Sequence, residues 1–180
     1  LSRLMLGTVQ FGLNYGIANK SSQPSYETAR DIIACAWESG VNCLDTAAIY
    51  GSSEEVFGKA LRELKLADKM TVVSKVCHMV DDLNASQADA VVEESVMLSL
   101  ERLGLDYLPV CMFHTEGNFL RYADSLLKLR DRGMARHVGS SVNTPRATAD
   151  IIRSGRAETI LFPYNWSKKM ANAKPRGVDK

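Results

Sequence analysis

Long apolar runs and blocks of basic residues are both missing from this sequence of 180 residues. The longest apolar runs, such as residues 107–113, are far shorter than the roughly 20 residues that a membrane-spanning helix needs. The first residues include neither a long apolar stretch nor a small-residue cleavage site, so they do not indicate secretion. With 22 basic against 21 acidic residues and no basic stripe, neither nucleic acid nor a membrane is an expected partner. No pattern indicates an oligomeric state.

Cysteine is sparse and lacks the spacing of a metal site or a disulfide framework. The four cysteines lie inside apolar segments, and we expect them to be buried, reduced thiols of a cytoplasmic protein. They are Cys35, Cys43, Cys77 and Cys111. The composition, 46% hydrophobic and 24% charged, is that of an ordinary globular domain.

Short apolar runs alternate with amphipathic stretches along the whole chain, in the order strand then helix. Most of the runs are continuously apolar, as expected for parallel strands covered on both faces. Glycines stand at the expected helix ends, and Ser53 is expected to cap a helix. The predicted strands are residues 4–9, 42–47, 70–76, 107–114, 136–141 and 158–165. The predicted helices are residues 25–39, 53–66, 86–103, 120–132 and 144–153.

Repeated strand–helix units favour an α/β fold, either a (β/α)₈ TIM barrel or an open doubly wound sheet. The units recur about every 28 to 30 residues, the pace of a barrel whose usual length is roughly 250 residues. We therefore expect a single domain over residues 1–180, an incomplete barrel with about six of its eight βα units. The open six-stranded sheet remains the alternative.

Several predicted strands end in a polar side chain where the pattern should be apolar. Asp45, Lys75 and His114 stand at three such ends, and Tyr50 follows Asp45 by five residues. The carboxyl ends of barrel strands share one face, so these four side chains are expected to converge there. Taken singly, the three strand-end residues have ordinary explanations: Asp45 as a turn or cap residue, Lys75 as a solvated charge at the rim and His114 as a histidine with a satisfied partner.

As a set, the four side chains make chemical sense. A buried Lys75 beside Asp45 forms a paired charge, which is tolerated where either alone is costly. We expect the Lys75 ammonium to lower the pKa of Tyr50 below its ordinary value of about 10, so that the phenol serves as a general acid. His114 would then donate a hydrogen bond that orients and polarises a carbonyl oxygen.

The stretch LDTAAIYGSSEEVFGKAL, residues 44–61, resembles the signature of the aldo-keto reductase family. GTVQFGLNYG at residues 7–16, SK at residues 74–75 and YLPVCMFH at residues 107–114 resemble further strands of that family. The resemblance implies reduction of a small aldehyde or ketone by hydride transfer from NADPH, with NADH as the second choice. It implies Tyr50 as the proton donor, Lys75 and Asp45 as the pair that tunes it, and His114 as the residue that orients the substrate.

The resemblance also implies residues for the cofactor. Thr8 and Asp45 match positions that contact the nicotinamide half, and Ser141 matches a residue that binds the carboxamide. Val142 and Leu161 depart from the family, which commonly has polar residues at both places. The opening segment looks most like bacterial members, some of which act on sugars or sugar-like aldehydes.

Two other functions stay open on the sequence. One is a non-catalytic member of the same fold that binds nicotinamide cofactor as a regulatory or scaffolding subunit, or an inactive truncated product. The other is a metal-dependent hydrolase, which the positions of His78, His114 and His137 disfavour because they are not spaced as a ligand set. No metal is therefore expected.

Overall fold

The computed structural model describes residues 1–16 and 22–163 of the chain. Six strands form one parallel sheet in which each strand pairs with the next in chain order. This order rules out the doubly wound alternative, because the strand order of a doubly wound sheet reverses partway. The strands are β1 (Leu6–Gly7), β2 (Cys43–Asp45), β3 (Thr71–Val76), β4 (Leu108–Phe113), β5 (Ala135–Ser141) and β6 (Thr159–Leu161).

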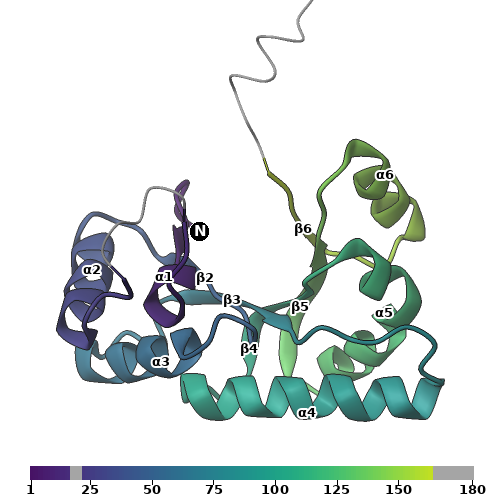
Figure 1. Cartoon of the computed structure of the whole chain (residues 1–180), viewed down its shortest axis with the longest axis horizontal. Coiled ribbons are helices and arrows are strands. Elements are labelled where there is room, and N and C mark those ends of the chain that lie inside the picture. The colour runs from purple at the N-terminus through teal and green to yellow at the C-terminus, as the bar shows by residue number, and fades with distance from the viewer. Residues whose placement is uncertain (17–21, 164–180) are drawn as a thin grey trace, which may run out of the picture.

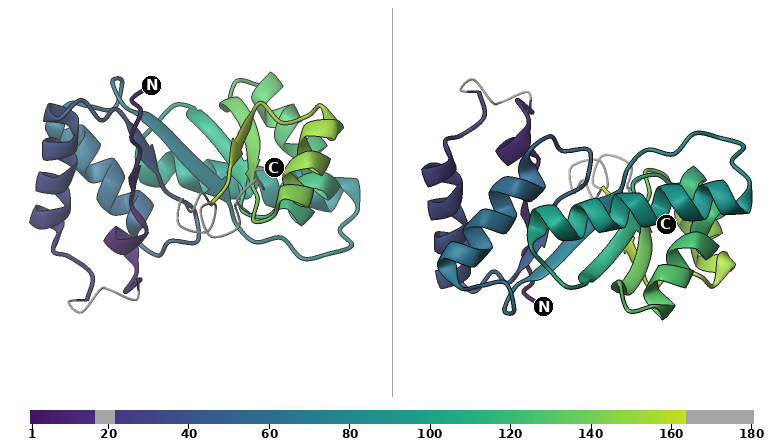
Figure 2. Two further views of the ribbon diagram at one scale, coloured as in Figure 1. Left: turned by 90° about the horizontal axis from the view of Figure 1, so that it is seen from above. Right: turned by 90° about the horizontal axis from the view of Figure 1, so that it is seen from below.

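The sheet curls, and the helices follow one another around its outside, with α4 running along the middle of the arc (Figure 1). Views from above and from below, each at 90° to that of Figure 1, show the same wrapping of helices about the strands (Figure 2). The expectation of an incomplete (β/α)₈ barrel is confirmed: the strands form a curled half-barrel. The helices are α1 (Val9–Gly12), α2 (Tyr26–Glu38), α3 (Ser53–Leu64), α4 (Ala85–Leu103), α5 (Glu116–Asp131) and α6 (Pro145–Ser154).

The two faces of the sheet carry very different cores. Successive side chains of a strand point to opposite faces, so each strand supplies both. The outer face, under the helices, holds a continuous apolar cluster that includes Leu44, Val72 and Phe113. The inner face holds a separate small cluster of Cys43, Val73, Val110 and Met112, against which Leu161 packs.

Local capping explains where several helices begin and end. Asn84 and Gln87 form a reciprocal capping box at the start of α4, and the side chain of Thr144 accepts from the backbone of α6. Gly104 and Gly155 close these two helices in the left-handed conformation, as their positions in the sequence predict.

Several predicted ends of strands and helices are wrong. The first strand is only Leu6–Gly7, because the chain turns at Thr8 into the short helix α1, which buries Phe11 in the outer core. Helix α5 begins at Glu116, four residues before the predicted start, because the Thr115 side chain caps it. The last strand is shorter than predicted, and residues 164 and 165 of that prediction lie outside the described residues.

The expectation of four buried thiols is wrong in part. Cys43 and Cys111 are buried and Cys77 is half-buried, but Cys35 is exposed because it lies on the solvent side of α2. All four are free thiols. Within the described residues, no helix is long and apolar enough to span a membrane.

Candidate active site

The candidate residues lie at the carboxyl ends of three adjacent strands. Asp45 is the last residue of β2, Lys75 is the last but one of β3, and His114 directly follows β4. Asp45 shares its face of the sheet with Cys43, and Lys75 with Val73, so both side chains lie on the inner face. The loop between β2 and α3 supplies Tyr50.

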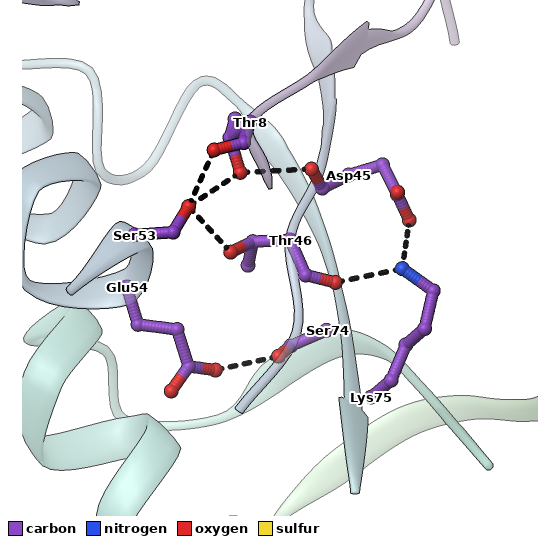
Figure 3. Close-up of polar contacts among 7 residues, drawn as sticks. All are labelled: Thr8, Asp45, Thr46, Ser53, Glu54, Ser74 and Lys75. Carbon is purple, nitrogen blue, oxygen red and sulfur yellow. Dashed lines mark hydrogen bonds and ion pairs between the residues drawn. The ribbon is translucent and has the colours of Figure 1, made fainter. Parts of the chain in front are cut away.

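Lys75 forms the centre of the site. Its Nζ donates to Oδ1 of Asp45 at 2.6 Å and to the carbonyl oxygen of Thr46 at 2.8 Å (Figure 3). The Lys75 side chain is 2% exposed, while that of Asp45 is 16% exposed. Burial lowers the pKa of Lys75, and the adjacent Asp45 carboxylate opposes that shift. Lys75 and Asp45 are therefore buried as an ion pair on the inner face, and the Asp45 carboxylate is the more solvent-exposed of the two.

Tyr50 and His114 complete the cluster. Nζ of Lys75 lies 5.0 Å from the centroid of the Tyr50 ring. The Tyr50 and His114 rings meet edge to face, with centroids 5.7 Å apart at 90°. The structure thus brings Asp45, Tyr50, Lys75 and His114 together at one mouth of the half-barrel.

The expectation that the pKa of Tyr50 is lowered is wrong. The pKa of Tyr50 is raised to about 12, first by burial and then by the negative charge of Asp45. Lys75 does not reverse this because its ammonium is paired with Asp45 and faces the tyrosine ring. Tyr50 is therefore fully protonated at neutral pH, with a proton to give but held more tightly than expected.

His114 is held in its neutral form. Burial, the charge of Lys75 and the neighbouring His78 lower the pKa of His114 to about 4. The ring of His78, an exposed residue, has its centroid 5.3 Å from that of His114. Nδ1 of His114 is buried without a hydrogen-bond partner among the described residues. Because an unpaired buried N–H is rarer than an unpaired lone pair, we assign the imidazole proton to Nε2.

The two other residues predicted to bind the cofactor, Ser141 and Thr8, differ in solvent exposure. Ser141 is half-buried at the end of β5, and the outward position of Val138 places Ser141 on the inner face. Thr8 is fully buried, and its hydroxyl donates to the carbonyl oxygen of Asp45 at 2.9 Å. Through this bond Thr8 fixes the end of β2, and its predicted contact with a cofactor remains a prediction.

Ser53 does not cap α3 as the sequence suggested. Ser52 is the N-cap, and its side chain makes no capping hydrogen bond to the helix, while the buried Ser53 hydroxyl donates to the carbonyl oxygen of Thr8 at 2.8 Å. The Thr46 hydroxyl lies 3.1 Å from the same Ser53 oxygen and donates to it in this arrangement. The start of α3 therefore ties β1 to β2 directly behind Asp45 (Figure 3).

The two departures from the family pattern have apolar surroundings. Val142 is fully buried in the outer core, and Leu161 packs against the inner cluster that contains Val110 and Met112. Neither position offers a polar group at the mouth. Across the described part of the chain, no three His, Cys, Asp or Glu side chains gather as metal ligands would.

Comparison with known proteins shows which family the chain is similar to. The profile of the Aldo/keto reductase family matches residues 3–169. An aldo-keto reductase from Mycolicibacterium paratuberculosis is 31% identical over 145 residues, 78% of this chain and 47% of the relative. The NADH-specific methylglyoxal reductase of Escherichia coli is 28% identical over 186 residues, 92% of this chain and 56% of the relative. The chain thus spans about half the length of these curated relatives.

Solved structures share the fold. A Pseudomonas aeruginosa protein assigned to the aldo-keto reductases superposes with a TM-score of 0.76 at 30% identity, covering 93% of this chain and 65% of that one. The glycerol dehydrogenase of Gluconobacter oxydans gives a TM-score of 0.69 at 28% identity, covering 92% and 52%.

Proposed function

Because the chain belongs to the aldo/keto reductase family, we propose that it reduces a small aldehyde or ketone with a reduced nicotinamide cofactor. One observation carries the proposal. A phenol that holds its proton, a neutral imidazole and a buried ammonium paired with a carboxylate meet at one mouth of the half-barrel. This set is able to bind a carbonyl oxygen and protonate it.

Tyr50 is the proposed proton donor. Its raised pKa keeps the hydroxyl protonated throughout the neutral range, and donation to the carbonyl oxygen leaves a tyrosinate. The Lys75 ammonium, 5.0 Å from the ring centroid, is a cation beside that developing charge. Lys75 would therefore stabilise the product of the proton transfer more than its starting state.

His114 and Asp45 have the positioning tasks. The Nε2–H group of the neutral His114 donates a hydrogen bond to the carbonyl oxygen and so orients the substrate beside Tyr50. Asp45 holds the Lys75 ammonium in place and offsets its charge.

The residues at the mouth fit the nicotinamide half of the cofactor. Asp45 and Ser141 both face the inner side at strand ends and are partly accessible, while the Thr8 hydroxyl is already engaged. The reduced nicotinamide, when bound, supplies the hydride for the carbonyl carbon. NADPH is the proposed cofactor, and NADH is the alternative because one relative is named as NADH-specific.

The test measures oxidation of NADPH and NADH by the full natural chain against a panel of aldehydes and ketones, including methylglyoxal and aldoses. We expect Tyr50→Phe to lower kcat by about 10² to 10⁴-fold, because it removes only the proton donor. Tyr107→Phe is the matched control, since Tyr107 is exposed just before β4, at the opposite end of that strand. Absence of turnover with every substrate, or full activity in Tyr50→Phe, would refute the proposal.

A further inference from the structure

Glu54 is a buried carboxylate for which the mechanism above has no use. Among the described residues, Glu54 and Lys75 are the charged side chains that are buried, with exposed fractions of 1% and 2%. Burying a carboxylate is costly unless partners compensate it, so its presence directly behind the site calls for an explanation.

The partners of Glu54 lead directly to Lys75. Oε1 of Glu54 accepts a hydrogen bond from the Ser74 hydroxyl at 2.6 Å, and Ser74 is the residue before Lys75 in β3 (Figure 3). Successive side chains leave a strand on opposite faces, so Glu54 holds β3 from the outer face while Lys75 enters the inner one. The negative charge of Glu54 also favours the charged form of Lys75.

Helix packing fixes Glu54 in this place. A side chain at Gly58 of α3 would strike the backbone carbonyls of Arg102 and Leu103, so only glycine allows α3 to lie this close to α4. The close approach brings Arg102 to Glu54, with Nη1 3.4 Å from Oε2. Arg102 is partly exposed, so it offsets only part of the buried negative charge.

We propose that Glu54 is a positioning residue for Lys75, which anchors the strand through Ser74 and supplies a second negative charge behind the ammonium. The proposal rests on the proposed reductase function and adds a role for a residue on the opposite face of the sheet. The other ionisable groups facing Lys75 are Asp45, Tyr50 and His114. Those facing Glu54, apart from Lys75, are Arg102 and Cys111.

The main test is Glu54→Gln in the full natural chain, which keeps the shape and removes the charge. Loss of a negative charge disfavours the protonated ammonium, so we expect the basic limb of the kcat profile to move down by roughly 0.5 to 1 pH unit. Glu55→Gln is the matched control, because Glu55 is the next residue of α3, is 62% exposed and lies 3.8 Å from Arg102. Its profile should stay that of the wild type.

Arg102→Gln gives a second test of opposite sign. Removing the cation leaves the charge of Glu54 less compensated, so the basic limb should move up instead of down. This variant keeps the proposal testable if Glu54→Gln does not fold. A purely structural role for Glu54 predicts lower stability in both variants and an unchanged basic limb of the kcat profile in both. That result would overturn the proposal.

Direct titration separates this proposal from the proposed function. The resonance of isotope-labelled Lys75 Cε, followed against pH without substrate, should report the same opposite shifts in the two variants. If the chain turns over no carbonyl compound but Lys75 shifts as expected, the reductase proposal fails and the positioning role stands. If turnover is present and Lys75 does not move, the positioning role fails.

Discussion

The outer and inner faces of the sheet are built from the same strands but carry side chains of different character. The outer face is closed by helices over a large apolar cluster, in which the Phe113 and Phe119 rings meet at 80° with centroids 6.2 Å apart. The inner face has only a small apolar cluster, and above it lies the ion pair of Lys75 and Asp45. Neighbouring residues such as Lys75 and Val76 therefore serve opposite purposes.

This division means that stability and chemistry can be changed separately. The outer cluster supplies most of the apolar burial, which is the main favourable contribution to folding. The inner mouth buries charge, which contributes little or nothing to stability even when it is paired. Glu54 is the exception that links the two, since it lies among the outer residues and acts toward the inner ones.

The largest contrast is expected from truncations on the two faces. Phe113→Ala, in the outer cluster, should lower the free energy of unfolding by about 3 to 5 kcal/mol. Val110→Ala, three residues earlier on the inner face, should lower it by only about 1.5 kcal/mol, because Val110 belongs to a small cluster where the loss of two carbons leaves no large enclosed cavity. Urea denaturation measures both. Equal losses, after allowance for side-chain size, would contradict the view that the outer face carries the stability.

A smaller effect is expected from the titration of His114. The unfolded pKa is about 6.5, and the folded value is lowered to about 4. Between these values the unfolded state binds more protons, so stability is complete above pH 6.5 and is lost as the pH falls toward 4. After allowance for partial exposure, we expect a loss of about 2 kcal/mol over this window.

The measurement compares urea denaturation at several pH values in the wild type and in His114→Gln. The variant should lose less stability on acidification, because its side chain takes up no proton. His137→Gln is the control, since His137 is 53% exposed and contacts Glu158 instead of the mouth. If both variants keep the wild-type acid loss, His114 is not held neutral by the fold.

Much of the arrangement could be predicted because strand periodicity and strand ends are local features. Parallel strands place their carboxyl ends at one edge, so Asp45, Lys75 and His114 were expected together before any coordinate was known. The strand–helix alternation likewise indicated the curled parallel sheet, though residues 4–9 form a shorter strand than expected because burial of Phe11 bends the chain into α1.

Other features depend on contacts between distant segments, which no local pattern contains. Glu54 in the first turn of a helix looks like an exposed residue that favours the helix dipole, and only the approach of α4 buries it. The pKa of Tyr50 is raised instead of lowered because burial of the side chain, and after it the negative charge of Asp45, disfavour the tyrosinate. The local sequence around Glu54 and Tyr50 therefore indicates neither the burial of the first nor the raised pKa of the second.

The smallest expected effect is a difference in the reactivity of the cysteines, which lie on both faces of the sheet and at the surface. Burial raises the pKa of the Cys43 thiol on the inner face, and raises that of Cys111 on the outer face to about 12. Cys35 is exposed, Cys43 is 6% exposed and Cys111 is 1% exposed. In the folded chain, an alkylating reagent should therefore modify Cys35 first and Cys111 last of these three.

Mass spectrometry of the labelled peptides over time gives the three rates. Cys43 should react several-fold faster than Cys111, because no helix layer covers the inner face in the described residues whereas Cys111 needs the outer layer to open. Equal rates at Cys43 and Cys111 would mean that one opening event exposes both thiols. The two faces would then unfold as a single cooperative unit, and the separation between a stabilising face and a chemical face would hold for the static structure alone.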